Sequence, residues 1–353
     1  MKRILFCIIL ILLMGCNEKP KTTINSNVVV IPDASYVSSD VSNVVLVNSP
    51  DLKIDNIIIG SADGGFIRRI KSIQKINNQT ILITDAATLE DVFTEGDFGL
   101  DYDAQGEDIN NPMTYSPIQF GKTLKVDIKQ NILKDPVTGS SVYVSGNVQT
   151  TPKFFFDASI KRMKFRNIEY RVSGDIDSNL YFVCDGIVGH NFGDIPIAFF
   201  PFVPLVIMVG NIPLVFTPYI TLYVGVEAYT EGTVTYNINK HTDFDLGGIY
   251  DGNGWTKIKD INEFAPVYTK ELYNGADGKI WIKAVFGLNI MMTSNLSVRL
   301  MPYSRFHGDI LKELWSVYLG VDTGANFNLK VLSWNIINWN QTIWSDEWLV
   351  YEG

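Results

Sequence analysis

Apolar and polar residues alternate along most of the chain after residue 120. A period of two places successive side chains on opposite faces of an extended strand, so each alternating segment has one dry face and one wet face. Only a mainly β fold buries such faces, and we expect an antiparallel β-sandwich or an elongated stack of sheets. The segments are 124–128, 168–172, 234–238, 280–282, 296–300 and 327–331.

Turn residues separate these segments, and helical periodicity is scarce. A helical turn is expected within 86–93, and 308–315 is the best candidate for a second short helix. Glycine paired with Asn or Asp supports the tight turns that join antiparallel strands. Such pairs are Gly210-Asn211, Asp251-Gly252, Asn253-Gly254 and Asp277-Gly278.

Composition indicates a folded protein with an acidic surface. Of 353 residues, 46% are hydrophobic and 19% are charged, which provides enough apolar material for one large domain or two modest ones. The formal net charge of −9 argues against nucleic acid as a partner, because phosphate contacts require a basic patch. Cys184 ends the apolar run 180–183, so we expect a buried thiol there rather than a nucleophile.

The first sixteen residues have the layout of a secretory signal. The positive start at 2–3 is followed by an apolar run over 4–14, which is too short for a membrane-spanning helix of about 20 residues. The run closes with Leu13-Met14-Gly15-Cys16, which resembles the lipobox of bacterial lipoproteins. In that family the Cys thiol carries a diacylglycerol and the chain is cut before it.

This resemblance implies that Cys16 is the lipidated first residue of a mature protein held in the bacterial cell envelope. Each buried methylene contributes about 0.8 kcal/mol, so two or three acyl chains make a permanent anchor. Asn17 stands where an Asp would mark inner-membrane retention, so the same resemblance implies the outer membrane. The expected partner is therefore the membrane, through the lipid on Cys16.

The chain divides into four expected regions. These are a signal peptide over 1–15, a polar tether over 16–50, a small β module over 51–120 and an antiparallel β domain over 121–353. Within the tether, 28–31 and 44–47 could each be a short strand, although a flexible spacer is the preferred interpretation. Residues 56–91 resemble a segment near the front of secreted, β-rich bacterial surface proteins. The resemblance implies an extracellular β module and supplies no catalytic residue.

Residues 195–226 contain no charged side chain. Five prolines within this stretch argue against a spanning helix, because each costs about 3 kcal/mol inside a helix. A hairpin of 205–209 and 212–216 with a Gly-Asn turn fits better, with Pro213 at the start of its second arm. Two interpretations stay open: a central hairpin buried on both faces, and a hairpin that inserts into a membrane or binds a partner.

An acidic segment is the sharpest candidate for a metal site. Side-chain oxygens at alternate positions suit a loop that wraps Ca²⁺, and a glycine at the sixth position permits its bend. Pro112 stands at the twelfth position, where such loops place a bidentate Glu. A solvated acidic loop is the alternative, and no other cofactor is expected. The candidate ligands are Asp101, Asp103, Gln105 and Glu107.

Tryptophans gather near the carboxyl terminus, with Asn and Gln between them. Aromatic faces cover the apolar C–H groups of sugars while amides bond the hydroxyls, so a carbohydrate platform is one interpretation. Rings that fill the core or cap a sheet are the other. The candidate ligand-binding residues are Trp334, Trp339 and Trp344.

The function that fits these observations best is a non-catalytic, envelope-anchored lipoprotein for adhesion, ligand binding or scaffolding, with a carbohydrate or a surface protein as partner. Two alternatives remain: a carbohydrate-active hydrolase on a β scaffold, which needs paired carboxylates across a cleft, and a membrane-inserting β protein. No Gly-x-Ser-x-Gly or His-Glu-x-x-His motif occurs in the sequence.

Overall fold

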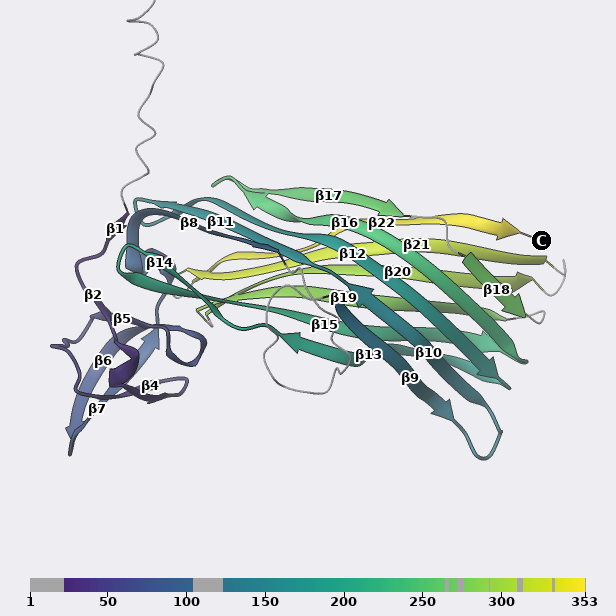
Figure 1. The fold of residues 1–353 in the computed structure, drawn as a ribbon, viewed down its shortest axis with the longest axis horizontal. Coiled ribbons are helices and arrows are strands. Elements are labelled where there is room, and N and C mark those ends of the chain that lie inside the picture. The colour runs from purple at the N-terminus through teal and green to yellow at the C-terminus, as the bar shows by residue number, and fades with distance from the viewer. Residues whose placement is uncertain are drawn as a thin grey trace, which may run out of the picture.

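Three β-sheets make up the protein in the computed structural model. Two long sheets pack face to face as a sandwich, and a small six-stranded sheet lies at one end (Figure 1). The mainly β, sandwich-like fold expected from the alternation is confirmed. The structure describes residues 22–103, 123–263, 267–271, 276–291, 293–309, 314–331 and 334–352.

The small module is one curled sheet with its own core. Its strands follow the order β2-β5-β6-β7-β4-β3, with β2 and β5 parallel and the other pairs antiparallel. A separate cluster of buried side chains fills it, including Val44, Ile58 and Phe66. Its elements are β2 (Val28–Val30), η1 (Asp33–Ser35), β3 (Tyr36–Ser39), β4 (Asn43–Val47), β5 (Ile57–Gly60), η2 (Ala62–Gly64), β6 (Phe66–Ile76) and β7 (Gln79–Ala86).

The module begins and ends earlier than the sequence predicted. Strands β2 to β4 lie within 16–50, so the expected polar tether is wrong from residue 22 onward. Short alternating runs such as 43–47 carry enough apolar side chains to join the module, where Val44 and Leu46 are fully buried. The module ends near Ala86, and α2 (Leu89–Val92) then leads the chain into the sandwich, which confirms the helical turn expected there.

The first long sheet is built around β12 (Phe165–Asp185). Strands β11 (Lys153–Lys161) and β10 (Ser141–Thr150) share one edge of β12, and β16 (Val234–Tyr250) pairs along its other edge from Ile168 to Cys184. All pairs in this sheet are antiparallel. The remaining strands are β1 (Thr23–Ile24), β8 (Phe93–Asp103), β9 (Leu124–Lys134), β17 (Trp255–Glu263) and β18 (Val267–Glu271).

The second long sheet follows the order β13-β15-β19-β20-β21-β22, and β14 shares the outer edge of β15 with β13. Consecutive hairpins from β19 onward explain this order, because tight turns join neighbouring antiparallel strands. Its strands are β13 (Val188–Pro201), β14 (Leu205–Val209), β15 (Ile212–Thr230), β19 (Asp277–Ile290), β20 (Ser294–Asp309), β21 (Leu314–Val331) and β22 (Trp334–Glu352).

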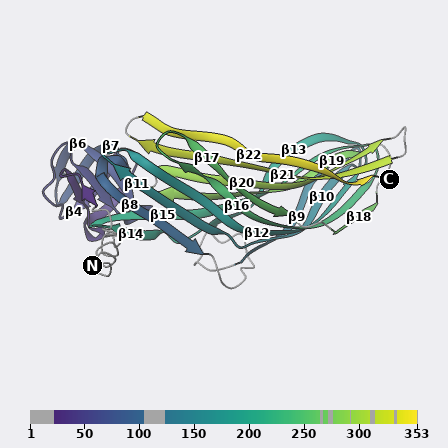
Figure 2. The same ribbon diagram turned by 90° about the horizontal axis from the view of Figure 1, so that it is seen from above.

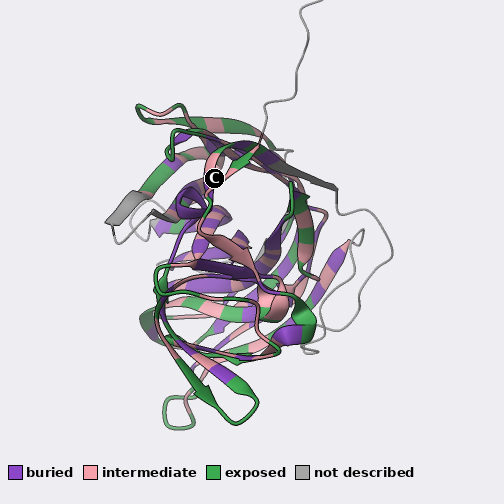
Figure 3. Ribbon diagram, turned by 90° about the vertical axis from the view of Figure 1, so that its left-hand side faces the viewer, coloured by how far each residue is buried: buried purple, intermediate pink, exposed green. Residues whose placement is uncertain are grey.

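Aromatic and aliphatic side chains of both sheets pack against one another in one core. Figure 3 shows buried residues recurring along the strands of the sandwich. The ring centroids of Phe244 and Phe286 lie 5.1 Å apart across the two sheets. The hydroxyl of Tyr170 donates to the carbonyl of Phe286 at 3.2 Å. Apolar residues at the alternating positions, such as Val126 and Val298, are buried as expected.

The uncharged stretch forms the predicted hairpin of β14 and β15, but its first arm is not buried on both faces. Val206 is 50% exposed and Met208 is 58% exposed on one face of β14, whereas Leu205 and Ile207 on the other face pack against the core. Beside it, β13 accommodates Pro196 with a bulge at a sheet edge, where a missing N–H costs little.

Two local predictions are wrong. The described ends of 308–315 pair as strands, Gly308 with Trp315 and Asp309 with Leu314, so cross-strand pairing overrides the weak helical pattern. Asp277-Gly278 opens β19 rather than forming a turn. The glycine is needed there because a Cβ atom on Gly278 would lie 2.3 Å from the ring of Phe306.

Candidate functional site

A hollow, here called the distal hollow, opens on the second sheet at the end far from the small module. Tyr229 of β15 pairs with Asp277, and Asp277 pairs with His307. The same row continues to Glu352 near the carboxyl terminus, and Figures 1 and 2 place that terminus opposite the module. Its volume is about 350 Å³, and it is lined by Glu227, Tyr229, Asp277, Gly278, Lys279, Arg305, Phe306 and His307.

The basic side chains of the distal hollow differ in how far other protein groups already bind them. Arg305 donates through Nε and Nη2 to both carboxylate oxygens of Glu347, and the imidazole of His307 hydrogen-bonds to Asp277. Lys279 forms no ion pair with the residues that the structure describes, and its ammonium lies 3.6 Å from the ring centroid of Tyr303. Burial lowers the pKa of Lys279, so an incoming anion would restore interactions that its ammonium lost with water.

Two rings beside the hollow lie flat on the sheet because glycines face them. A Cβ atom on Gly225 would come within 1.9 Å of the indole of Trp281, and one on Gly320 within 2.1 Å of the ring of Tyr303. Both rings are only 8% exposed and form a floor. Tyr229 is 45% exposed, so its ring is the one that offers an open face to a ligand.

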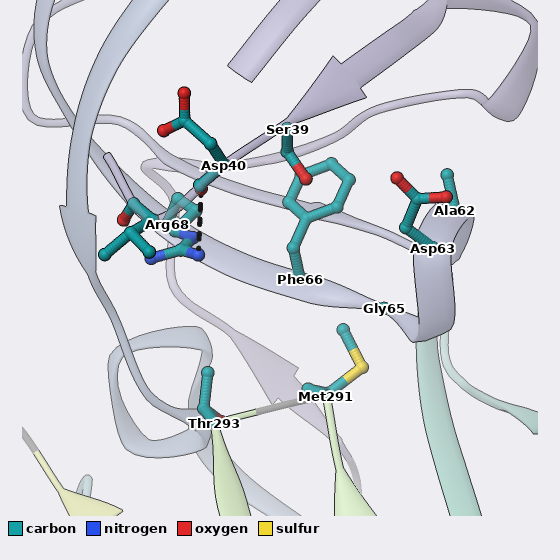
Figure 4. A pocket seen from close by; sticks show the side chains of 10 residues that line it. Ser39, Asp40, Ala62, Asp63, Gly65, Phe66, Arg68, Met291 and Thr293 are labelled. Atoms are coloured by element: carbon teal, nitrogen blue, oxygen red, sulfur yellow. Dashed lines mark hydrogen bonds between the residues drawn. The ribbon is translucent and has the colours of Figure 1, made fainter. Parts of the chain in front are cut away.

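A second cavity, here called the junction cleft, lies where the small module meets the sandwich. It has a volume of about 320 Å³. In Figure 4, the ring of Phe66 lies between Arg68 and Asp63, with Met291 below it. The module contacts the sandwich at Gly65, where an added Cβ atom would be 2.8 Å from Cβ of Val215.

The predicted tryptophan platform lies at a seam between the two long sheets. The indole of Trp339 stacks on Trp255 of β17, with centroids 5.1 Å apart and planes 9° apart. The ammonium of Lys259 lies 3.6 Å from the ring centroid of Trp344. Both tryptophans are half-buried and pack against the core, whereas the side chain of Trp334 is outside the described residues. The structure brings Trp339 and Trp344 to one seam, but neither lines the distal hollow or the junction cleft.

The predicted calcium ligands are divided between described and undescribed parts of the chain. The backbone of Asp101 and Asp103 lies at the end of β8, where these residues pair with Phe155 and Lys153. Gln105 and Glu107 lie outside the described residues, as does Cys16 with the whole lipobox. In the described ranges, no group of three or more His, Cys, Asp or Glu side chains could hold a metal ion.

Two buried titratable side chains contribute to packing. Burial raises the pKa of the Cys184 thiol to about 12, which confirms a buried thiol. Burial also raises the pKa of Glu90 to about 7. The carboxylate of Glu90 accepts the backbone N–H of Phe165 at 2.8 Å and so links α2 to the start of β12. Neither side chain lines either cavity.

Sequence reasoning missed both cavities, because their residues come from strands far apart along the chain. The alternation did contain a signal for the distal hollow. Lys279, Trp281, Tyr303 and Arg305 occupy the outward positions of two strands that pair with each other. Aromatic rings and cations at successive outward positions indicate that this outer face of the sheet can bind a ligand.

No protein-family model, curated protein or solved structure matches the chain. Within the parts of the chain that the structure describes, no helix has the length and apolar character needed to cross a bilayer.

Proposed function

We propose that the protein is a lipid-anchored envelope protein that binds carbohydrate, without catalysis, through the distal hollow. The observation that carries the proposal is the combination of the open ring of Tyr229 with carboxylates and a cation in one hollow. A sugar ring can cover the aromatic face with its C–H groups while its hydroxyls bond to Glu227 and Asp277. A volume of about 350 Å³ falls within the range of small-ligand sites, about 300–1,000 Å³.

Lys279 supports an acidic sugar as the ligand. Arg305 and His307 already contact carboxylates of the protein, whereas the ammonium of Lys279 is held over an aromatic ring. A sugar carboxylate would supply the counter-charge in a partly desolvated place, where a charge-assisted hydrogen bond is strong. A uronic acid is the simplest sugar with this chemistry.

The length of the sandwich supports binding away from the membrane. Strand β19 runs from Asp277 at the distal hollow to Ile290 beside the junction cleft. At roughly 3.4 Å per residue, this strand spans about 45 Å. A lipid on Cys16 would hold the module end at the envelope, since the described chain starts beside the module (Figure 1). The distal hollow would then face outward from the outer membrane.

Binding can be tested by affinity electrophoresis of residues 22–353. We expect polygalacturonate in the gel to retard the protein and the fully methyl-esterified polymer to retard it much less, because esterification removes the carboxylates. Lys279→Gln is expected to abolish the difference between the two polymers. Lys129→Gln is the matched control, because it removes an exposed lysine of β9 on the other sheet. Equal migration in both polymers and in an empty gel would count against the proposal.

The anchor has its own test. In cells that express the full chain, we expect a membrane-bound protein whose first residue is Cys16 with diacylglycerol attached. Cys16→Ala is expected to release the protein from the membrane fraction, because the acyl chains supply the anchoring free energy. Mass spectrometry that shows an unmodified amino terminus in the membrane fraction would refute the lipid anchor.

A further inference from the structure

We infer that the junction cleft is a second binding site, for a small molecule that has an apolar body and one carboxylate group. The cleft is a partly open space between two separately packed units, which is a preferred location for small-molecule sites. Its volume of about 320 Å³ lies at the lower end of the size range for such sites, so the ligand is small. The distal hollow takes no part in this site.

The guanidinium of Arg68 provides the positive charge. Nη1 donates to the carbonyl of Val41 at 3.0 Å and Nη2 donates to the carbonyl of Asp40 at 3.4 Å. These two bonds fix the planar group at the edge of the cleft (Figure 4). No carboxylate within the described ranges forms an ion pair with it. An arginine has five N–H donors in a rigid fork, so a carboxylate ligand can use donors that the two carbonyls leave.

The two carboxylates at the cleft are engaged elsewhere. Asp40 accepts the backbone N–H groups of Ser42 and Asn43, each at 2.8 Å, within its own turn. Asp63 accepts the hydroxyl of Tyr36. Both carboxylates keep their charge, but neither forms an ion pair with Arg68 among the described residues, so the remaining N–H donors of the guanidinium are available to a ligand.

The cleft also provides an apolar contact. Phe66 and Met291 lie beneath it and are 5% and 0% exposed, so most of the exposed apolar surface of the cleft belongs to Val41, which is 87% exposed. Ala62 and Val41 line the walls. An apolar body that covers Val41 and the exposed edge of Phe66 removes their surface from water while the carboxylate reaches Arg68.

Calorimetric titration of residues 22–353 with N-acetyl-L-phenylalanine tests this inference. N-acetyl-L-phenylalaninamide is the matched probe, because it has the same apolar body without the charge. We expect saturable binding of the acid and about tenfold weaker binding of the amide, which corresponds to about 1.4 kcal/mol. Equal affinity for the two probes, or no binding of the acid by the unmodified protein, would overturn the inference.

Two substitutions test the charge of Arg68 and the volume of the cleft separately. Arg68→Gln is expected to weaken binding of the acid about tenfold, whereas Arg166→Gln, at an exposed arginine of β12, is expected to leave it unchanged. Ala62→Trp narrows the cleft and keeps Arg68, so it is expected to abolish binding of both probes. If Arg68→Gln fails to fold, Ala62→Trp and the acid–amide pair still decide the outcome. Undiminished binding by Ala62→Trp would place the ligand elsewhere and contradict the proposed site.

Discussion

The indole of Trp281 lies against Gly225 on the neighbouring strand, and its Nε1 donates to Asp194 at 2.8 Å. Asp194 also pairs with Lys283, at 2.6 Å. The absence of a side chain at Gly225 is therefore what allows a large ring to lie flat between β13 and β20. This arrangement supports the outer face that continues to the distal hollow.

Gly225→Ala is expected to destabilise the protein by about 2 kcal/mol, because the new Cβ atom must displace a packed ring and its hydrogen bond. Thermal or urea unfolding measures the change. Gly189→Ala is the control on the same sheet, since the nearest atom to its Cβ position is 3.9 Å away. If both variants lost the same stability, the contact with Trp281 would not be the cause.

Gly65→Ala is expected to weaken the junction between the small module and the sandwich by about 2 kcal/mol. Gly65 has φ +90, and its Cβ atom would be 2.8 Å from Cβ of Val215. Gly139→Ala is the matched control, because φ there is +76 with nothing within 4 Å. The difference in unfolding free energy between the two variants measures the clash alone, and a difference near zero would contradict the packing described here.

Glu90 is expected to make the protein more stable as pH falls from 7 toward 4.5. Its pKa is raised from 4.5 to about 7 by burial, so the folded state holds the proton more tightly than the unfolded state does. This stabilisation is fully present below pH 4.5 and is lost as pH rises through about 7. Its size is on the order of 3 kcal/mol.

Urea unfolding across this pH range measures the effect. Glu90→Gln keeps an oxygen that accepts the N–H of Phe165, and it is expected to flatten the pH dependence. Glu231→Gln, at an exposed position, is expected to leave the dependence as it is. A pH profile of Glu90→Gln that matched the unmodified protein would show that another group is responsible.

Cys184 is expected to be inert in the folded protein. Its thiol is buried with a pKa raised to about 12, and only the thiolate attacks a disulfide reagent. Residues 22–353 at pH 8 should show no reaction with 5,5′-dithiobis(2-nitrobenzoate) until denaturant is added, and then one thiol per chain. Rapid reaction of the native protein would mean that the β12 core opens far more readily than its packing indicates.

The fold class could be predicted from the sequence because alternation reports the two faces of each strand directly. Val126, Tyr236 and Val298 are buried at the alternating positions where the pattern placed them. The boundary of the small module could not be predicted, because β2 is only three residues long and its parallel pairing with β5 leaves no local signature.

The candidate site was much less predictable, because register decides which outward side chains meet. Tyr229, Lys279 and Arg305 come together only because β15, β19 and β20 pair in one particular register. The tryptophans were conspicuous in the sequence, yet Trp339 stacks on Trp255, which the prediction had not included. Large rings that cluster along the chain thus indicated a seam between sheets as readily as a ligand platform.

The most direct measurement of the central claim is a calorimetric titration of trigalacturonate into two matched tyrosine variants. Tyr229→Ala removes the open ring of the distal hollow, and Tyr181→Ala removes a ring that is 40% exposed on the first sheet, compared with 45% for Tyr229. The account predicts that Tyr229→Ala weakens binding about tenfold or more while Tyr181→Ala binds like the unmodified protein. Equal binding by both variants and the unmodified protein would contradict it.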